Sequence, residues 1–224
     1  MNVGASQRAD AIVTLGDSIT DGVQSTPDTN HHWPNVLAER LQARRNLDRL
    51  AVLDEGINGN RLLSEGNFAP NALKRFDRDV LAQAGVQYLI VLIGINDIGH
   101  SALGDGPTVT PADIIFGYRQ IVAGAHEHNI PVYGATLTPM GGSRYDLPAA
   151  QALRQAVNEW IRSSSDFDAV IDFDLVTRDP SQPTRLLPQY DSGDHLHPND
   201  AGYLAMGQAV PLRLFRENID SGDR

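Results

Sequence analysis

The run Val86–Ile93, VQYLIVLI, is apolar at nearly every position. A strand with one solvated face alternates apolar and polar residues, so an unbroken apolar run indicates a strand that is covered on both faces. Such strands lie at the centre of parallel sheets, and parallel neighbours require crossover connections that are usually helices. This run therefore favours an α/β protein over an all-α or all-β one.

The rest of the chain repeats the alternation of strand and helix. Shorter apolar runs predict further strands at Ala11–Leu15, Leu50–Leu53, Pro131–Leu137 and Val170–Phe173. Apolar residues at helical spacing predict intervening helices at Trp33–Leu41, Asn71–Ala82, Pro111–His128, Leu147–Ser163 and Asn199–Phe215. Repeated strand–helix units predict a doubly wound α/β/α sandwich of three layers around a five-stranded parallel sheet.

The chain contains no internal repeat and no linker. This predicts one domain over residues 1–224, with a core from about residue 10 to about residue 216. The long polar connections are Gly99–Pro111, Pro139–Asp146 and Thr177–Gly193. They are predicted pocket walls, because ligands of such sheets bind beyond the carboxyl ends of the strands.

Charge and composition exclude several classes of function. The net charge of −10, from 28 acidic residues and 18 Lys and Arg, argues against nucleic acid or an anionic membrane as the main partner. The absence of cysteine excludes disulfides, thiolate nucleophiles and cysteine metal sites. No apolar run approaches the ~20 residues that cross a bilayer, and the N-terminal stretch MNVGASQRAD has no apolar signal region. We therefore expect no membrane span.

The first predicted strand ends abruptly in the polar segment Gly16–Gly22, GDSITDG. A phosphate-binding loop would need a lysine after its second glycine, where Val23 stands. The nucleophile elbow of α/β-hydrolases would need a glycine where Thr20 stands. Taken alone, the segment is open to two interpretations: Asp17 or Ser18 caps a helix, or Ser18 is a nucleophile.

Polar groups also follow the second and third predicted strands. The second strand leads into Asp54–Arg61, DEGINGNR, and the third into Gly94–Asp97, GIND. Asn and Asp at strand ends often only make side-chain turns, and glycine permits positive φ. Because parallel strands end at the same edge of a sheet, these segments and GDSITDG are predicted to face one crevice.

The segment Asp191–Tyr203, DSGDHLHPNDAGY, places two histidines among several aspartates before the last predicted helix. Asp194 and His197 are three residues apart, so one turn of chain can bring the carboxylate against the imidazole. A histidine oriented in this way can deprotonate a serine hydroxyl. The alternative is a zinc site formed by His195, His197 and Asp194, although no other cluster in the sequence completes the ligand set.

Together, these segments resemble the SGNH hydrolases, also called the GDSL-type esterase and lipase family. The matching blocks follow the family's order over nearly the whole chain: Gly16–Ile19 (with Ile in place of Leu), Gly56–Gly59, Gly94–Asp97 and Asp194–His197. The segments GDSITDG, GINGNRLL and GDHLHPNDAGY are similar to those of bacterial secreted members. The resemblance implies the flavodoxin-like fold of SGNH hydrolases.

The resemblance also implies a role for each matching residue. Ser18 is the expected nucleophile, His197 the general base and then general acid, and Asp194 the carboxylate that orients His197. The expected oxyanion hole comprises the backbone N–H groups of Ser18 and Gly59 and the side-chain amide of Asn96. No metal and no organic cofactor are expected.

Neighbouring polar residues are given supporting roles. Asp17 and Asp97 are predicted to close loops behind the reactive groups, because short carboxylates accept hydrogen bonds from nearby backbone N–H groups. His195 stands between the two expected catalytic residues, and we interpret it as part of the pocket wall or as a group behind it.

The remaining candidates follow from loop position. Arg61 and Arg144 are the cations nearest the predicted crevice, and we interpret them as surface or ion-paired arginines, with binding of an acidic substrate group as the alternative. Tyr145, Trp33 and Met140 are predicted to form an apolar or sugar-stacking wall.

The expected function is hydrolysis of carboxylic esters of short acyl groups through an acyl-enzyme intermediate, including acetyl groups on carbohydrates. The absence of a long apolar loop favours small acyl groups. The alternatives are a lysophospholipase or thioesterase, and a carbohydrate-binding protein that kept the fold and lost the reaction. The expected partner is a small-molecule or carbohydrate ester. The resemblance implies a soluble, secreted or periplasmic protein whose signal peptide is not part of this sequence.

Overall fold

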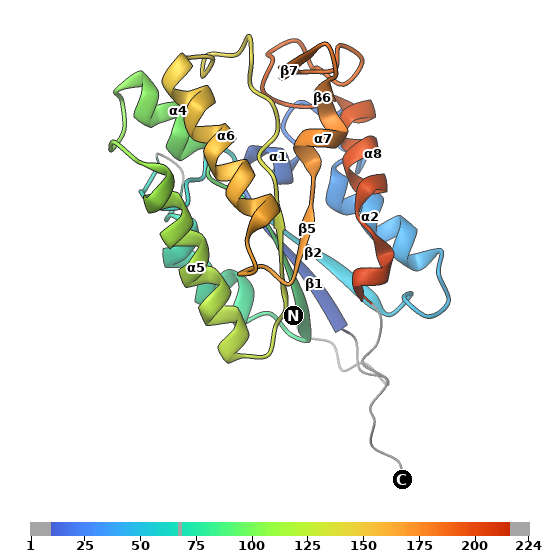
Figure 1. Cartoon of the computed structure of the whole chain (residues 1–224). Helices are drawn as coiled ribbons and strands as arrows, with labels where there is room; N and C mark the ends of the chain where they lie inside the picture. The colour runs from blue at the N-terminus through green and yellow to red at the C-terminus, as the bar shows by residue number, and fades with distance from the viewer. Residues whose placement is uncertain (1–9, 67–68, 216–224) are drawn as a thin grey trace.

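The computed structural model describes residues 10–66 and 69–215, and its centre is a five-stranded parallel sheet (Figure 1). The strands are β1 (Asp10–Gly16), β2 (Leu50–Gly56), β3 (Val86–Leu92), β4 (Val132–Ala135) and β5 (Ala169–Ile171), in the order β2-β1-β3-β4-β5. This is the strand order of flavodoxin-like sheets. The predicted fold class is confirmed, whereas the two ends of the predicted domain, residues 1–9 and 216–224, lie outside the described residues.

Helices cover both faces of the sheet and complete the three layers (Figure 1). One face carries α2 (Trp33–Gln42) and α8 (Asp200–Ala209), and the other carries α4 (Ile95–Leu103), α5 (Pro111–Glu127) and α6 (Pro148–Ser163). The short elements are α1 (Ser18–Asp21), α3 (Ala72–Phe76), the π-helical turn η1 (Asp77–Leu81), α7 (Phe173–Thr177) and the 3-10 turn η2 (Leu212–Phe215). A separate antiparallel hairpin consists of β6 (Arg178–Asp179) and β7 (Gln182–Leu186). None of the described helices is long and apolar enough to cross a bilayer.

β1 and β3 form the centre of the core because both of their faces are covered. Ile12, Val13 and Leu15 of β1 are completely buried, and Leu89–Leu92 of β3 is almost completely buried. Burial of each large apolar side chain contributes about 1.5–3 kcal/mol relative to exposure. The unbroken apolar run of β3 thus has the central position that its sequence predicts.

α5, the longest helix, begins where its capping residues place it. Thr110 Oγ1 accepts a hydrogen bond from the N–H of Asp113, and the Asp113 carboxylate accepts one from the N–H of Thr110. This reciprocal capping box satisfies two N–H groups that a helix start leaves unpaired. Pro111 takes the first helical position, where an N–H is not needed.

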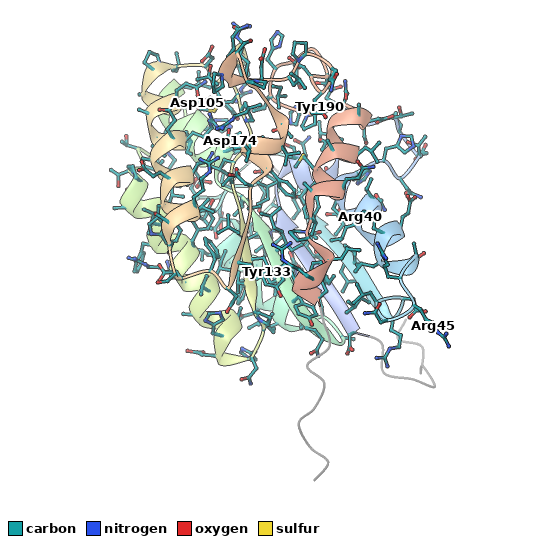
Figure 2. The ribbon with its side chains drawn as sticks, turned by 45° about the vertical axis from the view of Figure 1, so that its right-hand side comes forward. Arg40, Arg45, Asp105, Tyr133, Asp174 and Tyr190 are labelled. Atoms are coloured by element: carbon teal, nitrogen blue, oxygen red, sulfur yellow. The ribbon has the colours of Figure 1, made fainter. Side chains whose placement is uncertain are left out.

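The C-terminal helix is shorter than predicted. The helix expected over Asn199–Phe215 ends at Ala209, because Pro211 has no N–H with which to continue the helical ladder. The chain then forms η2, which is held to the sheet where the Tyr133 hydroxyl donates to the Leu214 carbonyl at 2.6 Å (Figure 2).

Two other predicted elements also differ from the structure. The strand expected over Val170–Phe173 ends at Ile171, because Asp172 accepts a hydrogen bond from the N–H of Leu175 and caps α7 instead. The helix expected over Asn71–Ala82 is α3 followed by the π-helical turn η1. The first difference arises from a side-chain hydrogen bond that apolar periodicity does not report.

Two of the predicted polar connections contain regular structure. The connection Gly99–Pro111 begins inside α4, and Thr177–Gly193 contains the β6–β7 hairpin. Gly99 does not mark a loop: a Cβ there would lie 2.3 Å from the Tyr145 ring, so glycine is needed for this ring to pack against α4. The glycine that favoured a loop in the sequence is therefore a packing residue.

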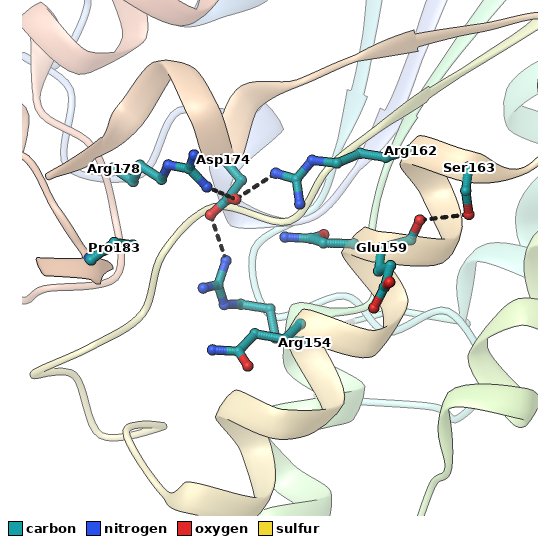
Figure 3. Close-up of a pocket in the computed structure, with 9 residues that line it drawn as sticks. Arg154, Glu159, Arg162, Ser163, Asp174, Arg178 and Pro183 are labelled. Carbon is teal, nitrogen blue, oxygen red and sulfur yellow. Dashed lines mark hydrogen bonds and ion pairs between the residues drawn. The ribbon is translucent and has the colours of Figure 1, made fainter. Parts of the chain in front are cut away.

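An ion-pair cluster joins α6 to α7 and lines a cavity of about 470 Å³ (Figure 3). Asp174 accepts hydrogen bonds from Arg154, Arg162 and Arg178. Arg162 also binds both carboxylate oxygens of Asp172. Each of these guanidinium groups therefore has a carboxylate partner, and the cluster stabilises the packing of α7 on α6.

Candidate active site

Ser18 lies at the carboxyl end of β1, the edge at which β2 and β3 also end. Asp17 caps α1 by accepting a hydrogen bond from the N–H of Ile19, so the chain turns sharply and Ser18 becomes the first helical residue. Ser18 is 3% exposed. α1 is a single turn, and the segment GDSITDG therefore contains both a cap and a positioned serine hydroxyl.

His197 lies against Ser18 although the two residues are 179 positions apart in the sequence. Its Nε2 is 2.8 Å from Ser18 Oγ, and its Nδ1 is 2.6 Å from Oδ2 of Asp194. When Nδ1 carries the proton and donates to Asp194, Nε2 is free to accept from the serine hydroxyl. Such a pair can take up the serine proton as Oγ attacks an electrophilic carbon.

Asp194 is held as an anion by its surroundings. Partial burial raises its pKa, but hydrogen bonds from the backbone N–H and ring of His197 and from the N–H of Leu196 lower the pKa to about 2. A carboxylate that is ionised throughout the neutral range stabilises the imidazolium that forms when His197 accepts a proton.

Gly59 and Asn96 line the same cleft as Ser18. Gly59 has φ +71°, a conformation that other residues rarely adopt. Asn96 Nδ2 donates to the Asn60 carbonyl at 3.0 Å, and its Oδ1 accepts from the Tyr145 hydroxyl at 3.0 Å. These bonds fix the orientation of the amide, whose second N–H has no acceptor among the described residues. That N–H and the backbone N–H groups of Ser18 and Gly59 can donate to an oxyanion.

The cleft over these groups has a volume of about 420 Å³. Most of its lining residues are polar, and Tyr145 and Leu196 are the larger apolar side chains among them. The lining residues are Ser18, Asn58, Gly59, Asn96, His100, Ser143, Arg144, Tyr145, Asp194, Leu196 and His197. The structure thus brings together the residues predicted for the catalytic triad and the oxyanion hole.

The predicted apolar wall is only partly correct. Tyr145 lines the cleft, but Trp33 and Met140 are both 0% exposed and belong to the hydrophobic core. Trp33 begins α2, whose apolar side packs toward the sheet, so its position next to a loop does not place it in the cleft.

Of the other polar candidates, Arg144 lines the cleft, whereas Arg61 is not among the described lining residues and its Nη1 lies 3.3 Å from Ser64 Oγ. His195 points away from the catalytic pair: its Nδ1 is 2.5 Å from Asp191 Oδ2, and it lines a separate cavity of about 330 Å³. The predicted position of His195 in the wall of the catalytic cleft is therefore wrong.

Asp17 and Asp97 are buried behind the cleft. Asp97 accepts hydrogen bonds from the N–H groups of Leu62 and Leu63, at 2.7 and 2.9 Å, and so ties α4 to the segment after β2. Burial raises the pKa of Asp17 to about 7 and that of Asp97 to about 6. Both residues close loops, as the sequence predicts.

His100 and Arg75 are among the residues of the site that were not predicted from the sequence. His100 follows Asn96 by one helical turn and lines the same cleft, and helical spacing would have indicated it had α4 been expected. Arg75 is 1% exposed, and it donates to the Gly16 carbonyl at 2.9 Å and to Asn60 Oδ1 at 3.0 Å. No motif points to Arg75, because its partners come from two separate loops.

The zinc alternative does not fit the geometry. Both ring nitrogens of His197 are engaged, one by Asp194 and one by Ser18, and Nδ1 of His195 is engaged by Asp191. Across residues 10–66 and 69–215, no group of three or more His, Cys, Asp or Glu side chains is arranged to hold a metal ion.

A serine hydroxyl against a carboxylate-paired imidazole, beside free amide donors, is the arrangement found in serine hydrolases. Family comparison agrees with this class. A sequence profile of the GDSL-like Lipase/Acylhydrolase family matches residues 14–205. The chain belongs to this family and is an ester hydrolase.

Solved structures with the same fold differ widely in sequence. A carbohydrate acetylesterase family member from Sinorhizobium meliloti is 16% identical with a TM-score of 0.70, over 92% of this chain and 97% of that one. The aryl esterase of M. smegmatis is 18% identical with a TM-score of 0.67, over 92% and 98%. A GDSL-like lipase from Bacteroides thetaiotaomicron is 18% identical with a TM-score of 0.66, over 90% and 86%. No curated protein sequence matches the chain.

Proposed function

We propose that the protein hydrolyses carboxylic esters of short acyl groups through an acyl-enzyme intermediate on Ser18. The observation that carries the proposal is the 2.8 Å contact between His197 Nε2 and Ser18 Oγ, backed by Asp194 on Nδ1. The proposed catalytic residues are Ser18, His197 and Asp194. The proposed oxyanion donors are the N–H groups of Ser18 and Gly59 and the Asn96 amide.

In the first half of the proposed reaction, Ser18 Oγ bonds to the ester carbonyl carbon while its proton passes to His197 Nε2. The carbonyl oxygen becomes an oxyanion, and each donor that binds it contributes about 3–4 kcal/mol to the transition state. The bond from carbon to the alcohol oxygen then breaks, and the alcohol leaves with the proton from His197. In the second half, water attacks the acyl-enzyme with the same proton transfers, and the acid is released.

The size and polarity of the cleft support short acyl groups. The cleft has a volume of about 420 Å³, and among its described lining residues only Tyr145 and Leu196 have large apolar side chains, which is a short apolar surface for a long acyl chain. Acetyl groups on carbohydrates are the proposed substrates within this class, supported by the structural likeness to the S. meliloti carbohydrate acetylesterase family member. Long-chain acyl hydrolysis, as in a lysophospholipase or thioesterase, would need an apolar groove for the chain.

A panel of p-nitrophenyl esters of increasing acyl length, measured beside acetylated xylan, tests the proposal. We expect kcat/KM to be highest for acetyl and to fall as the chain lengthens. Ser18→Ala should abolish turnover while the far-UV spectrum stays unchanged, and a fluorophosphonate should label the native enzyme but not this variant. Turnover by Ser18→Ala near the native rate would refute the assignment. Absence of labelling in the folded native protein would also refute it and would favour a carbohydrate-binding protein.

We also propose that the whole chain acts as one catalytic domain, and that the protein is secreted or periplasmic in its host. The second proposal is supported by the likeness of the sequence blocks to those of secreted GDSL esterases. Fractionation of host cells with an antibody to the protein would test it, and recovery solely with the cytoplasm would contradict it.

A further inference from the structure

Arg144 lines the catalytic cleft, and its positive charge has no carboxylate partner among the described residues. Several arginines elsewhere in the molecule are different. Those of the α6–α7 cluster all contact Asp174 (Figure 3), and Arg119 pairs with Asp166 at 2.8 Å. An ion pair on the surface contributes little to stability, so an exposed arginine without a carboxylate partner is not unusual in itself. The missing partner matters for Arg144 because this residue lines the cleft that contains Ser18.

The guanidinium of Arg144 is nevertheless held in place. Its Cζ lies 4.7 Å from the centroid of the Tyr145 ring, and Nη2 lies 3.3 Å from both the Tyr145 hydroxyl and His100 Nε2. Within the described part of the chain, Nε and Nη1 have no hydrogen-bond partner. A guanidinium that is ordered through one nitrogen and free at the other two loses little conformational entropy when it binds an anion.

The neighbours of Arg144 do not cancel its charge. Asp105 is engaged by His100 at 2.7 Å, and this hydrogen bond, with the charges of Arg144 and Arg61, holds the pKa of Asp105 below its usual value. Asp194, the carboxylate of the cleft lining, is engaged by His197. At this end of the cleft, two guanidinium groups and one imidazole therefore share one carboxylate.

We propose that the cleft takes esters that carry a carboxylate, and that Arg144 binds this carboxylate while the ester carbonyl lies against Ser18. The proposal rests on the proposed ester hydrolysis and specifies its substrate class. A carboxylate matches the planar guanidinium and adds charge-assisted hydrogen bonds to it. The carboxylate can belong to the alcohol part, as in an acetylated uronic acid, or to the acyl part, as in the half-ester of a dicarboxylic acid.

The structure limits the distance between this carboxylate and the reacting carbonyl. The Tyr145 hydroxyl contacts Arg144 Nη2 at 3.3 Å and donates to Asn96 Oδ1 at 3.0 Å. The guanidinium therefore lies about two hydrogen-bond lengths from the proposed oxyanion donor Asn96. Only a few covalent bonds can separate the carboxylate from the ester carbonyl, which one acidic sugar residue or a short diacid satisfies.

Matched pairs of substrates test the proposal and distinguish the two sources. The alcohol arm compares acetylated methyl galacturonoside with acetylated methyl galactoside, and the acyl arm compares monoethyl succinate with ethyl pentanoate, all by pH-stat. We expect the acidic member of one pair to have a kcat/KM about tenfold or more above its neutral match. Arg144→Gln should lower that ratio about tenfold, and Arg144→Lys should lower it less, because lysine keeps the charge without the planar fork.

Arg119→Gln is the matched control, since Arg119 also lies over an aromatic ring, that of Trp160 at 5.8 Å, but stands on α5 outside the cleft. This variant should leave the ratio of acidic to neutral substrate unchanged. Two results would overturn the inference: Ser18-dependent hydrolysis with no preference for the acidic substrates, or a preference that the Arg144→Gln variant retains. Either result leaves the proposed function intact. Failure to hydrolyse any of these esters overturns both.

Discussion

Tyr145 connects the proposed oxyanion donor Asn96 to the arginine of the cleft. Its buried hydroxyl donates to Asn96 Oδ1, so the amide presents Nδ2 to the cleft and to the Asn60 carbonyl. Tyr145→Phe leaves Oδ1 without its donor and frees the amide to rotate. We expect kcat on p-nitrophenyl acetate to fall about tenfold, or about 1.4 kcal/mol, with a smaller change in KM.

A double variant shows whether Tyr145 acts through Asn96. Asn96→Ala alone should lower kcat about 100- to 1000-fold, as expected for loss of one oxyanion donor. Adding Tyr145→Phe to Asn96→Ala should then cost almost nothing more, because the group that Tyr145 positions is already gone. Additive losses in the double variant would show that Tyr145 does not act by positioning Asn96.

Asp17 makes the stability of the protein depend on pH. Burial raises its pKa to about 7, and the charge of Asp97 adds to the shift. The pKa of aspartate in the unfolded chain is about 4. Between about pH 4 and about pH 7 the folded state therefore binds a proton at Asp17 that the unfolded state has lost, and the stability of the protein falls as the pH rises through this range. Asp17→Asn removes the charge and keeps an oxygen for the N–H of Ile19. Thermal unfolding at about pH 8 should show a gain of about 2 kcal/mol that shrinks toward about pH 5.

Asp97→Asn is the informative comparison for this prediction. Asp17 Oδ2 is buried and unpartnered among the described residues, whereas both oxygens of Asp97 accept backbone N–H groups. An amide at position 97 must turn a donor toward one of those N–H groups, so this variant should be destabilised at every pH. Equal pH profiles for Asp17→Asn and the native protein would show that Asp17 does not carry the pH dependence.

At the scale of elements, the sequence predicts those that bury a whole apolar face. β3 and α5 were predicted with ends correct to within one residue, because apolar periodicity defines them. α4 and α7 were missed because they start directly after strand ends, in segments whose Asn, Asp and Gly residues look like turns. Apolar periodicity cannot distinguish such a turn from a helix cap, since both use the same side chains.

The residues of the candidate site also fall into two groups, those that a sequence motif locates and those that it does not. Ser18, Gly59 and Asn96 stand in short motifs after strands, and the pair Asp194–His197 stands in a short motif before the last helix, so one sequence is enough to locate them. His100, Ser143 and Arg75 have no such motif, because their contribution depends on which loops the folded chain places beside them. Trp33 and Met140 were misplaced for the same reason: nearness to a loop does not determine which way a side chain points.

Arg75 of α3 holds the loops after β1 and β2 together. It donates to the Gly16 carbonyl, to Asn60 Oδ1 and to Asp79 Oδ2, all at 2.9–3.0 Å, and these loops carry two of the proposed oxyanion donors. Arg75→Met removes all three bonds within the protein. We expect a loss of about 2–4 kcal/mol in urea unfolding and, in the fraction that stays folded, a kcat about tenfold lower.

Arg78→Met is the control for this element. Arg78 pairs with the same carboxylate, Asp79, but its side chain is 65% exposed and it bonds to neither loop. Its loss should destabilise the protein much less than Arg75→Met and leave kcat unchanged. If Arg75→Met reduces stability without lowering kcat at a temperature where it is folded, the bridge between the loops is structural only.

At the scale of the whole molecule, the groups of the candidate site come from segments that are far apart in the chain. Ser18 follows the central strand β1, Asn96 follows β3, and His197 precedes the last helix. The loop that carries His197 is tied on both sides: Asp191 forms a β-bridge with Pro198. No single half of the sheet contains a complete set of catalytic groups.

This arrangement predicts that urea removes activity and structure together. Trp33 is buried in α2 against Phe173 of α7, with ring centroids 5.2 Å apart, so its fluorescence reports the packing of the layer that holds α8 in place. We expect the midpoints of ester hydrolysis, tryptophan fluorescence and far-UV dichroism to coincide, because unfolding of the layer that holds α8 removes His197 from Ser18. Loss of activity at clearly lower urea, with both spectra still native, would show instead that the Asp191–Pro198 loop opens on its own. The catalytic contact would then depend on a local unfolding equilibrium rather than on the stability of the sheet.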